Sequence, residues 1–149
     1  MSAVNFYHLT RTPLEKTLPR LLEKVLAGGM RAVVMCDSDA RLEALDAHLW
    51  TYDQGSFLPH GRERDGDPAD QPIYLTRKEE NPNGAGVLVV TDGIEATHLD
   101  QFQRCLDLFD GNDEAAVAAA RDRWRRLREA GHEVTYWAQN AGGGWERKG

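Results

Sequence analysis

Two kinds of hydrophobic spacing follow one another at the beginning of the chain. Apolar and polar side chains alternate over residues 4–9, which is typical of a strand. Over residues 14–25 the apolar positions instead recur every three or four residues, which predicts a helix. Residues 12–15 supply an N-cap threonine, a proline at the first helical position and a capping-box glutamate, and Gly28 supplies the stop. The chain is therefore expected to begin with a strand and a helix.

The same succession repeats from residue 31. Residues 31–36 form a near-continuous apolar run, as expected of a strand that is covered on both faces. Residues 37–39 can cap a second helix, in which Leu42, Leu45 and Leu49 form the buried stripe. The order strand, helix, strand, helix favours a mainly parallel sheet with right-handed crossovers.

The rest of the chain continues this pattern with shorter elements. Apolar runs, polar turns and cap residues separate the segments. In chain order we expect a surface loop (residues 56–70), a short strand (72–75), a polar turn (78–86), a buried strand (86–91), a strand or a helix turn (102–109), a helix that Asn112 or Asp113 caps and Gly131 ends, and a last strand (133–138).

The pattern predicts an α/β fold: a single domain over residues 1–141, with an open, mainly parallel sheet and helices on both faces. Glycines begin a flexible tail over residues 142–149. Sheets of this kind often hold a nucleotide on a glycine-rich turn after the first strand. Residues 10–13 contain no glycine, and neither G-x-G-x-x-G nor G-x-x-x-x-G-K-[ST] occurs in the sequence, so no nucleotide-binding loop is expected.

Composition limits the class of protein. The chain has 149 residues, a formal net charge of -6 and 41% hydrophobic residues, which is an ordinary globular balance. Without an apolar run long enough for a bilayer or a basic, apolar leader, we expect a cytoplasmic protein with no membrane contact. Cys36 and Cys105 lie in apolar segments far apart in sequence, which favours buried reduced thiols.

Catalytic and metal signals are weak. Asp37 and Asp39 follow a strand and could hold Mg²⁺ for phosphoryl transfer, which is the alternative function that we consider. Aspartates at the start of a helix are equally explained as caps of its free N–H groups. The five histidines show no zinc-site spacing, and no G-x-S-x-G nucleophile elbow occurs. No catalytic residue, metal or cofactor is therefore predicted.

Five arginines between positions 121 and 128 lie on the last predicted helix of this acidic chain. With Arg121 at zero on a helical wheel, Arg125 lies at about 40° and Arg128 at about 340°, so these three share a stripe. The core-facing side lies at about 220–300°, and Val117 lies at the seam between it and the stripe. Arg123 and Arg126 point elsewhere and are expected only to aid solubility.

The stripe is suited to an acidic partner. A guanidinium beside an apolar crevice can bind a carboxylate bidentately while an apolar side chain of the partner enters the crevice. Nucleic-acid phosphate fits less well, because a single stripe on an acidic protein would bind it weakly and no stacking aromatics lie beside it. A solvated helix face with i,i+4 ion pairs remains the plain structural alternative.

A second candidate surface combines the end of the second helix with the loop after it. Trp50 follows Leu49, and Phe57, Leu58 and Pro59 follow in the loop. Exposed Trp and Phe side chains on such segments are typical anchors of protein interfaces. The same residues would be ordinary core residues if the loop folds back, and the sequence leaves both interpretations open.

The chain resembles the chi subunits of bacterial DNA polymerase III holoenzyme over essentially its whole length. The most specific part of the likeness is Leu-Trp at residues 49–50 followed by Ser-Phe-Leu-Pro-His at residues 56–60. Further matching segments are Asn-Phe-Tyr at 5–7, Ala-His at 47–48, Gln-Pro-Ile at 71–73, Leu-Phe-Asp-Gly at 108–111, Ala-Arg-Asp-Arg-Trp at 120–124 and Ala-Gly at 130–131.

The resemblance implies a non-catalytic accessory subunit of a DNA-directed DNA polymerase, with an open α/β fold that lacks a nucleotide. It implies that one surface binds the acidic, phenylalanine-ended C-terminal tail of single-stranded-DNA-binding protein, with the principal arginine at Arg121. It implies that a second surface, at Trp50 and Phe57, binds the psi subunit and so links the protein to the clamp loader. Some members of the family also engage a repair helicase through that surface, so the resemblance implies that helicase and psi would compete, and that DNA is contacted only indirectly.

The chain departs from the family pattern at two places. Val117 stands where some members carry a second basic residue one turn before Arg121, and Arg125 can take over its charge. Residues 110–111 are Asp-Gly where the family has an apolar residue and a proline. We therefore predict a tail-binding site and a psi-binding site. The tail-binding site comprises Arg121, Val117, Arg125 and Arg128, and the psi-binding site comprises Trp50, Phe57, Leu58 and Pro59.

Overall fold

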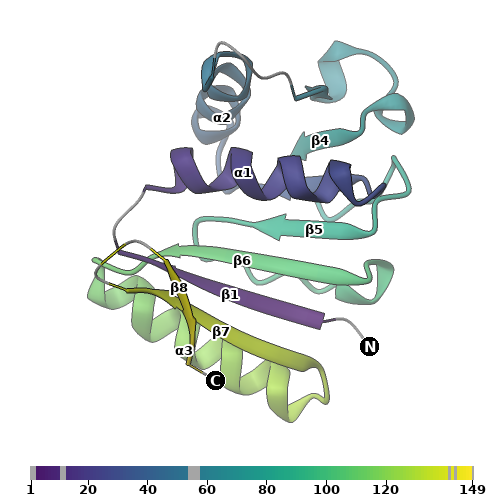
Figure 1. The fold of residues 1–149 in the computed structure, drawn as a ribbon. Coiled ribbons are helices and arrows are strands. Elements are labelled where there is room, and N and C mark those ends of the chain that lie inside the picture. The colour runs from purple at the N-terminus through teal and green to yellow at the C-terminus, as the bar shows by residue number, and fades with distance from the viewer. Residues whose placement is uncertain (1–2, 11–12, 54–57, 141, 143, 149) are drawn as a thin grey trace.

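A single eight-stranded sheet forms the middle of the protein in the computed structural model, which describes residues 3–10, 13–53, 58–140, 142 and 144–148 (Figure 1). The strands lie in the order β3-β4-β2-β5-β6-β1-β7-β8. They comprise β1 (Ala3–Leu9), β2 (Ala32–Met35), β3 (His60–Gly61), β4 (Ile73–Thr76), β5 (Val87–Val90), β6 (Arg104–Asp110), β7 (Glu133–Gln139) and β8 (Trp145–Arg147).

All neighbouring strands are parallel except β7 and β8, which pair antiparallel. Helices α1 (Leu14–Ala27) and α2 (Asp39–Thr51) pack on one face, and α3 (Glu114–Glu129) packs on the other against β6, β7 and β1 (Figure 1). In the connections that the structure describes, short 3₁₀ helices lie at Glu63–Asp65, Pro68–Asp70 and Leu99–Gln101. The predicted α/β class, the mainly parallel open sheet and the helices on both faces are confirmed.

One hydrophobic core lies on each face of the sheet, and the alternation of side chains along the strands explains both. Alternate positions of β1 face opposite sides, so that Phe6 packs under α3 while Leu9 packs with α1. Every residue of β2, β4 and β5 is buried, as expected of strands covered on both faces. On α1, Leu18 and Leu22 lie one turn apart and are fully buried.

Several local expectations are resolved. Residues 104–110 form a strand, and Asp113 caps α3 by accepting the backbone N–H groups of Ala115 and Ala116. Ser38 caps α2 through the N–H of Arg41. The predicted cap residue Thr12 lies outside the described residues, and Pro13, which was predicted to be the first helical residue of α1, occupies the N-cap position instead. None of the helices that the structure describes is long and apolar enough to cross a membrane.

The segment expected to be a flexible tail, residues 142–149, contains a short strand. Residues 145–147 form strand β8, which pairs with residues 137–139 of β7. The Asn140 side chain accepts the backbone N–H groups of Gly142 and Gly144, both at 3.0 Å, and so closes the turn between the two strands. Gly142 and Gly144 therefore belong to a hairpin connection, which the sequence pattern alone did not distinguish from a loose tail.

Candidate functional site

The five arginines of α3 divide into an inward and several outward side chains. Arg123 is buried and binds Asp107 of β6 bidentately, with Nε–Oδ2 at 2.9 Å and Nη2–Oδ1 at 3.1 Å. Its guanidinium also lies 6.0 Å from the centre of the Phe6 ring. The expectation that Arg123 only aids solubility is wrong, because its charge neutralises a carboxylate inside the core under α3.

The outward arginines make weaker contacts. Arg126 pairs with Glu95 across the surface, and Arg125 pairs with Asp122 at 3.4 Å between Nη1 and Oδ1. The Arg128 guanidinium lies over the ring of Trp124, 5.1 Å from its centre. Exposed ion pairs of this kind contribute little to stability, so these charges remain available to a partner.

Arg121 and Arg125 line a surface hollow that we call the arginine pocket, with a volume of about 520 Å³. Trp124 of α3, Tyr136 and Ala138 of β7, His8 of β1 and Lys148, just after β8, complete its lining. Of the four residues predicted for the tail site, two meet here. Val117 is instead partly buried in the core under α3, and Arg128 lies over Trp124 without lining the hollow.

A chain of polar contacts supports the floor of the arginine pocket. His8 Nε2 lies 3.3 Å from the Gly111 carbonyl oxygen, so this nitrogen carries the donated proton. His8 Nδ1 then accepts the Tyr136 hydroxyl at 2.7 Å. Burial raises the pKa of the Tyr136 hydroxyl, and the neighbouring Arg121 guanidinium offsets part of that rise. The contacts with His8 fix the orientation of the Tyr136 ring, and Arg121 lies beside this ring.

Gly111 is required beneath this floor. A Cβ atom added at Gly111 would lie 2.0 Å from His8 Cδ2 and 2.7 Å from the Leu9 carbonyl oxygen. Real Cβ atoms do not approach other atoms this closely, so a larger residue would displace the imidazole. The glycine noted as a departure from the family pattern therefore accommodates His8.

Of the residues predicted for the psi-binding site, Trp50 lies at the protein surface. Its side chain is 54% exposed, and it is the large hydrophobic residue that stands out as exposed in the described part of the chain. Leu58, at 2% exposure, packs in the core with α1 and α2, so its prediction as a docking residue is wrong. Pro59 is partly exposed, and Phe57 lies outside the described residues. The loop thus folds back at Leu58 while Trp50 stays at the surface.

A buried polar network lies beneath Trp50. The Trp50 and His60 rings lie 4.3 Å apart. His60 contacts the Leu58 carbonyl oxygen through Nδ1 at 2.6 Å and Asp46 Oδ1 through Nε2 at 3.1 Å. Asp46 Oδ2 also lies 3.2 Å from Arg62 Nε. Burial raises the pKa of Asp46, and the nearby His60 acts in the opposite direction.

Sequence reasoning missed this network, although one signal was present. Asp46 occupies a position four residues after Leu42 and next to Leu45, on the buried stripe of α2. A carboxylate at an apolar position needs a buried partner, and His60 and Arg62 supply it. The network ties residues 58–62 to α2 beneath Trp50.

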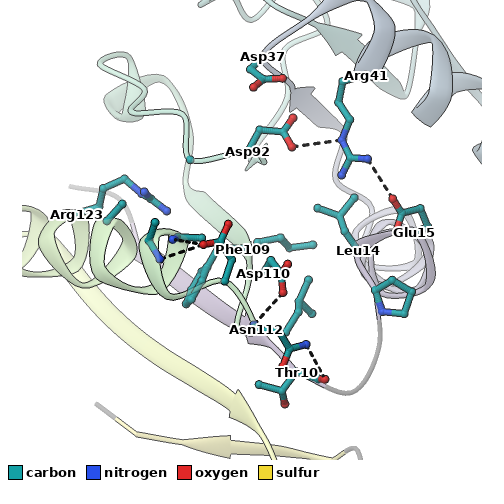
Figure 2. Close-up of a pocket in the computed structure, with 18 residues that line it drawn as sticks. Thr10, Leu14, Glu15, Asp37, Arg41, Asp92, Phe109, Asp110, Asn112 and Arg123 are labelled. Atoms are coloured by element: carbon teal, nitrogen blue, oxygen red, sulfur yellow. Dashed lines mark hydrogen bonds and ion pairs between the residues drawn. The ribbon is translucent and has the colours of Figure 1, made fainter.

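A hollow of about 960 Å³ lies where β1, β5 and β6 end and where α1 and α3 begin (Figure 2). We call it the strand-end cleft. Its position is the one that α/β proteins commonly use for ligands. Two of its residues, Arg41 and Arg123, carry positive charge, and five carry carboxylates. The carboxylates belong to Glu15, Asp37, Asp92, Asp110 and Asp113.

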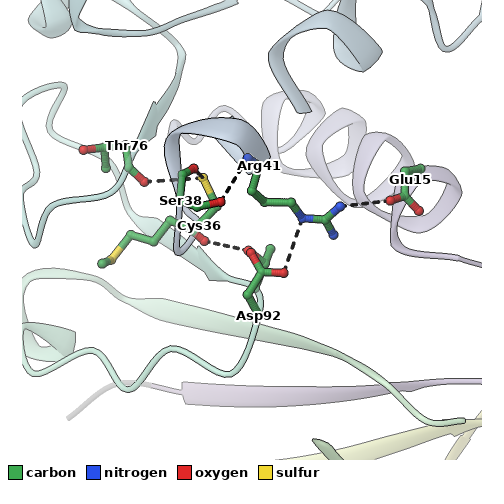
Figure 3. A network of polar contacts seen from close by, with 8 residues as sticks. Glu15, Cys36, Ser38, Arg41, Thr76 and Asp92 are labelled. Carbon is green, nitrogen blue, oxygen red and sulfur yellow. Dashed lines mark hydrogen bonds and ion pairs between the residues drawn. The ribbon is translucent and has the colours of Figure 1, made fainter. Parts of the chain in front are cut away.

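Both positive charges of the strand-end cleft are already paired. Arg41 Nη1 lies 3.1 Å from Glu15 Oε1, and Arg41 Nε lies 3.3 Å from Asp92 Oδ1 (Figure 3). Burial alone would raise the pKa of Glu15, but its backbone hydrogen bond and Arg41 outweigh this and lower it. With Arg123 committed to Asp107, the cleft has an excess of negative charge and does not favour a phosphate.

The two aspartates of the alternative magnesium site point to different places. Asp37 lines the strand-end cleft, whereas Asp39 lies outside it and pairs with Arg77 at 3.3 Å. Within the described residues, no three His, Cys, Asp or Glu side chains lie close enough to hold a metal ion. Cys36, beside Arg41 and Asp92, is a buried thiol whose pKa burial raises to about 11, and Cys105 is likewise buried and free.

Comparison with known proteins identifies the family to which the sequence is similar. Residues 1–135 match the family described as DNA polymerase III chi subunit, HolC. The chain is 33% identical over 109 residues to the probable DNA polymerase III subunit chi of Rickettsia prowazekii, covering 73% of this chain and 66% of that relative. It is 28% identical over 137 residues to the DNA polymerase III subunit chi of Pseudomonas aeruginosa, covering 90% and 94%. The subunit chi of Haemophilus influenzae is 24% identical over 134 residues, covering 87% and 92%.

Proposed function

The chain belongs to the DNA polymerase III chi subunit family, and we propose that it acts in DNA replication as a non-catalytic accessory subunit of that polymerase. In this role it binds the acidic C-terminal tail of single-stranded-DNA-binding protein at the arginine pocket. It contacts DNA only indirectly, through the protein that coats it.

The arginine pocket is the observation that carries this proposal. It combines Arg121 and Arg125 with the aromatic walls of Trp124 and Tyr136, in a chain of net charge -6. A terminal carboxylate can bind the planar fork of Arg121, while an apolar side chain beside that carboxylate packs against the aromatic rings. A peptide that is acidic and ends in phenylalanine has both groups.

A labelled peptide that is acidic and ends in Ile-Pro-Phe tests the tail site. Wild-type protein should bind it with a dissociation constant of about 1 μM, and more weakly as salt is added. Arg121→Ala should weaken binding about ten-fold or more, which corresponds to about 1.4 kcal/mol.

Arg77→Ala is the matched control for that experiment. Arg77 is an exposed arginine that pairs with Asp39, outside the arginine pocket. Its removal changes the net charge by the same amount and should leave the affinity unchanged. Equal affinity of wild type and Arg121→Ala would contradict the assignment. Tight binding of a naked oligonucleotide at physiological salt would instead favour direct nucleic-acid binding.

We also propose that the Trp50 surface binds the psi subunit and thereby links the protein to the clamp loader. The support is an exposed tryptophan, held by its contact with His60 over a buried polar network. Rigid, exposed aromatic side chains are frequent energetic centres of interfaces. A repair helicase that uses the same surface would compete with psi.

Two variants separate the two surfaces. Trp50→Ala should abolish co-purification with the psi subunit of the same organism and leave peptide affinity intact. Arg121→Ala should weaken binding of the peptide and leave co-purification with psi intact. Loss of both partners in either variant, accompanied by a lower melting temperature, would mean that the residue supports the fold and not a docking surface.

A further inference from the structure

We propose that Lys148 is the third cation of the arginine pocket and binds an acidic side chain of the docked peptide. This inference rests on the proposed function, since it adds a residue to the site that receives the tail. Lys148 lies after residue 135, where the match to the family ends, so the contribution belongs to the part of the chain beyond that match.

The pairing of β8 with β7 places Lys148 beside the pocket. Arg147 lies opposite Trp137, and the backbone N–H of Lys148 donates to the Tyr136 carbonyl oxygen at 2.7 Å. Residues that face each other across an antiparallel pair project to the same side of the sheet. Because Tyr136 faces α3, Lys148 does so as well, and its side chain lines the same hollow as Arg121 and Arg125.

The hairpin holds Lys148 in that place before a partner arrives. The Trp145 ring meets the Tyr7 ring edge to face, with centres 5.2 Å apart, on the opposite side of the sheet. Trp145 is also partly buried against the core that α1 and α2 cover. Together with the Asn140 turn, this contact anchors the start of the short strand, and the hydrogen bond from the Lys148 N–H to the Tyr136 carbonyl oxygen holds its end. Less ordering entropy is then lost when a peptide meets the lysine.

Lys148 can leave its ion pair with Glu146 and bind a carboxylate of the partner at a small cost in free energy. Its Nζ lies 3.1 Å from Glu146 Oε2, and both side chains are about half exposed. An exposed pair of this kind is worth little, so a carboxylate of the peptide can replace Glu146. Arg121, Arg125 and Lys148 then present three positive charges from two elements around one aromatic hollow. An acidic peptide has several carboxylates to pair with them.

Charge variants of Lys148 test this inference. In fluorescence anisotropy with the labelled peptide at low salt, Lys148→Ala should weaken binding about three- to five-fold and Lys148→Glu more than ten-fold. Both losses should shrink as salt is added, because the lysine is exposed and its attraction is screened. Both variants should keep the wild-type melting temperature.

The matched control is Lys78, which is exposed and paired with Glu63 at 3.3 Å, as Lys148 is with Glu146. Lys78 lies outside the arginine pocket, so Lys78→Ala and Lys78→Glu should leave the affinity unchanged. A second control is a peptide whose acidic side chains are replaced by amides. Lys148→Ala should have no effect on its binding.

The outcomes distinguish this inference from the proposed function. If wild type binds, Arg121→Ala weakens binding, and the Lys148 and Lys78 variants behave alike, then Lys148 has no part in the site while the proposed function stands. If wild type fails to bind the peptide at all, the proposed function is overturned and the role of Lys148 with it.

Discussion

The strand-end cleft and the arginine pocket differ in size, place and charge. The cleft is the larger hollow and lies where the parallel strands end, but its carboxylates outnumber its arginines, and both arginines are paired inside the protein. The arginine pocket is smaller and lies toward the β7–β8 edge of the sheet, where the cations are exposed. The usual ligand position of the fold class therefore does not favour an acidic ligand here, whereas the sign and availability of the charges favour the arginine pocket as the proposed docking site.

The largest expected effect separates Arg123 from Arg121. Arg123→Ala would leave Asp107 as an unpaired buried carboxylate and should reduce the free energy of unfolding by about 3–5 kcal/mol. Arg121→Ala removes an exposed charge and should change stability by less than about 0.5 kcal/mol. Urea denaturation of the two variants measures the difference.

A double variant provides the control for that comparison. Arg123→Met together with Asp107→Leu removes both buried charges and should recover most of the stability lost in Arg123→Ala. The recovered protein should bind the tail peptide as wild type does, because neither residue lines the arginine pocket. A folded double variant that cannot bind the peptide would assign the docking site to the cleft side of α3.

The reactivity of the Cys36 thiol beside the strand-end cleft reports mainly how deeply this side chain is buried. Burial, and then the nearby Asp92, raise the pKa of Cys36 to about 11, so its reactive thiolate is scarce at pH 8. Labelling of Cys36 in a Cys105→Ala background should be at least about ten-fold slower in the folded protein than in urea. It should accelerate as the pH rises toward 11. Equal rates in both states at pH 8 would show that the thiol is neither buried nor shielded.

The smallest expected effect concerns Arg41. Arg41→Ala removes the partner of Glu15 and Asp92 and should cost about 1 kcal/mol or less, since these groups are partly exposed. Peptide affinity should not change. A ten-fold loss of affinity would contradict the assignment and would place the acidic peptide in the strand-end cleft, at the one cation there that could be released to it.

Periodicity predicted most of the fold because apolar spacing reports directly which side of an element is covered. It located β1, β2, β5, β7 and all three helices to within a few residues. It failed for β8, because a three-residue strand after glycines carries no measurable period. Pairing with β7 and the contact between Trp145 and Tyr7 decide that segment, and both are tertiary.

The candidate site was predicted in part for a similar reason. Arg121 and Arg125 were placed correctly on one side of α3, but the side chains that meet them come from β1, β7 and the end of β8. Arg123 was misjudged because its charge suggested exposure, although at about 200° it borders the core side of the helical wheel. Asp107, which lies on the same face of β6 as the buried Cys105 and Phe109, was the signal that a buried cation was needed.

The two outer strands of the sheet restrict how partners can attach. β3 has two residues and β8 has three, and two of the three β8 residues, Glu146 and Arg147, are charged. Short, charged edge strands offer few free backbone groups to a strand of another chain. Recognition by β-augmentation, in which a peptide extends a sheet through main-chain hydrogen bonds, is thus disfavoured along β3 and β8 themselves. A partner that meets these two strands should instead be selected by side chains, and such an interface can then change by single substitutions without disturbing the sheet.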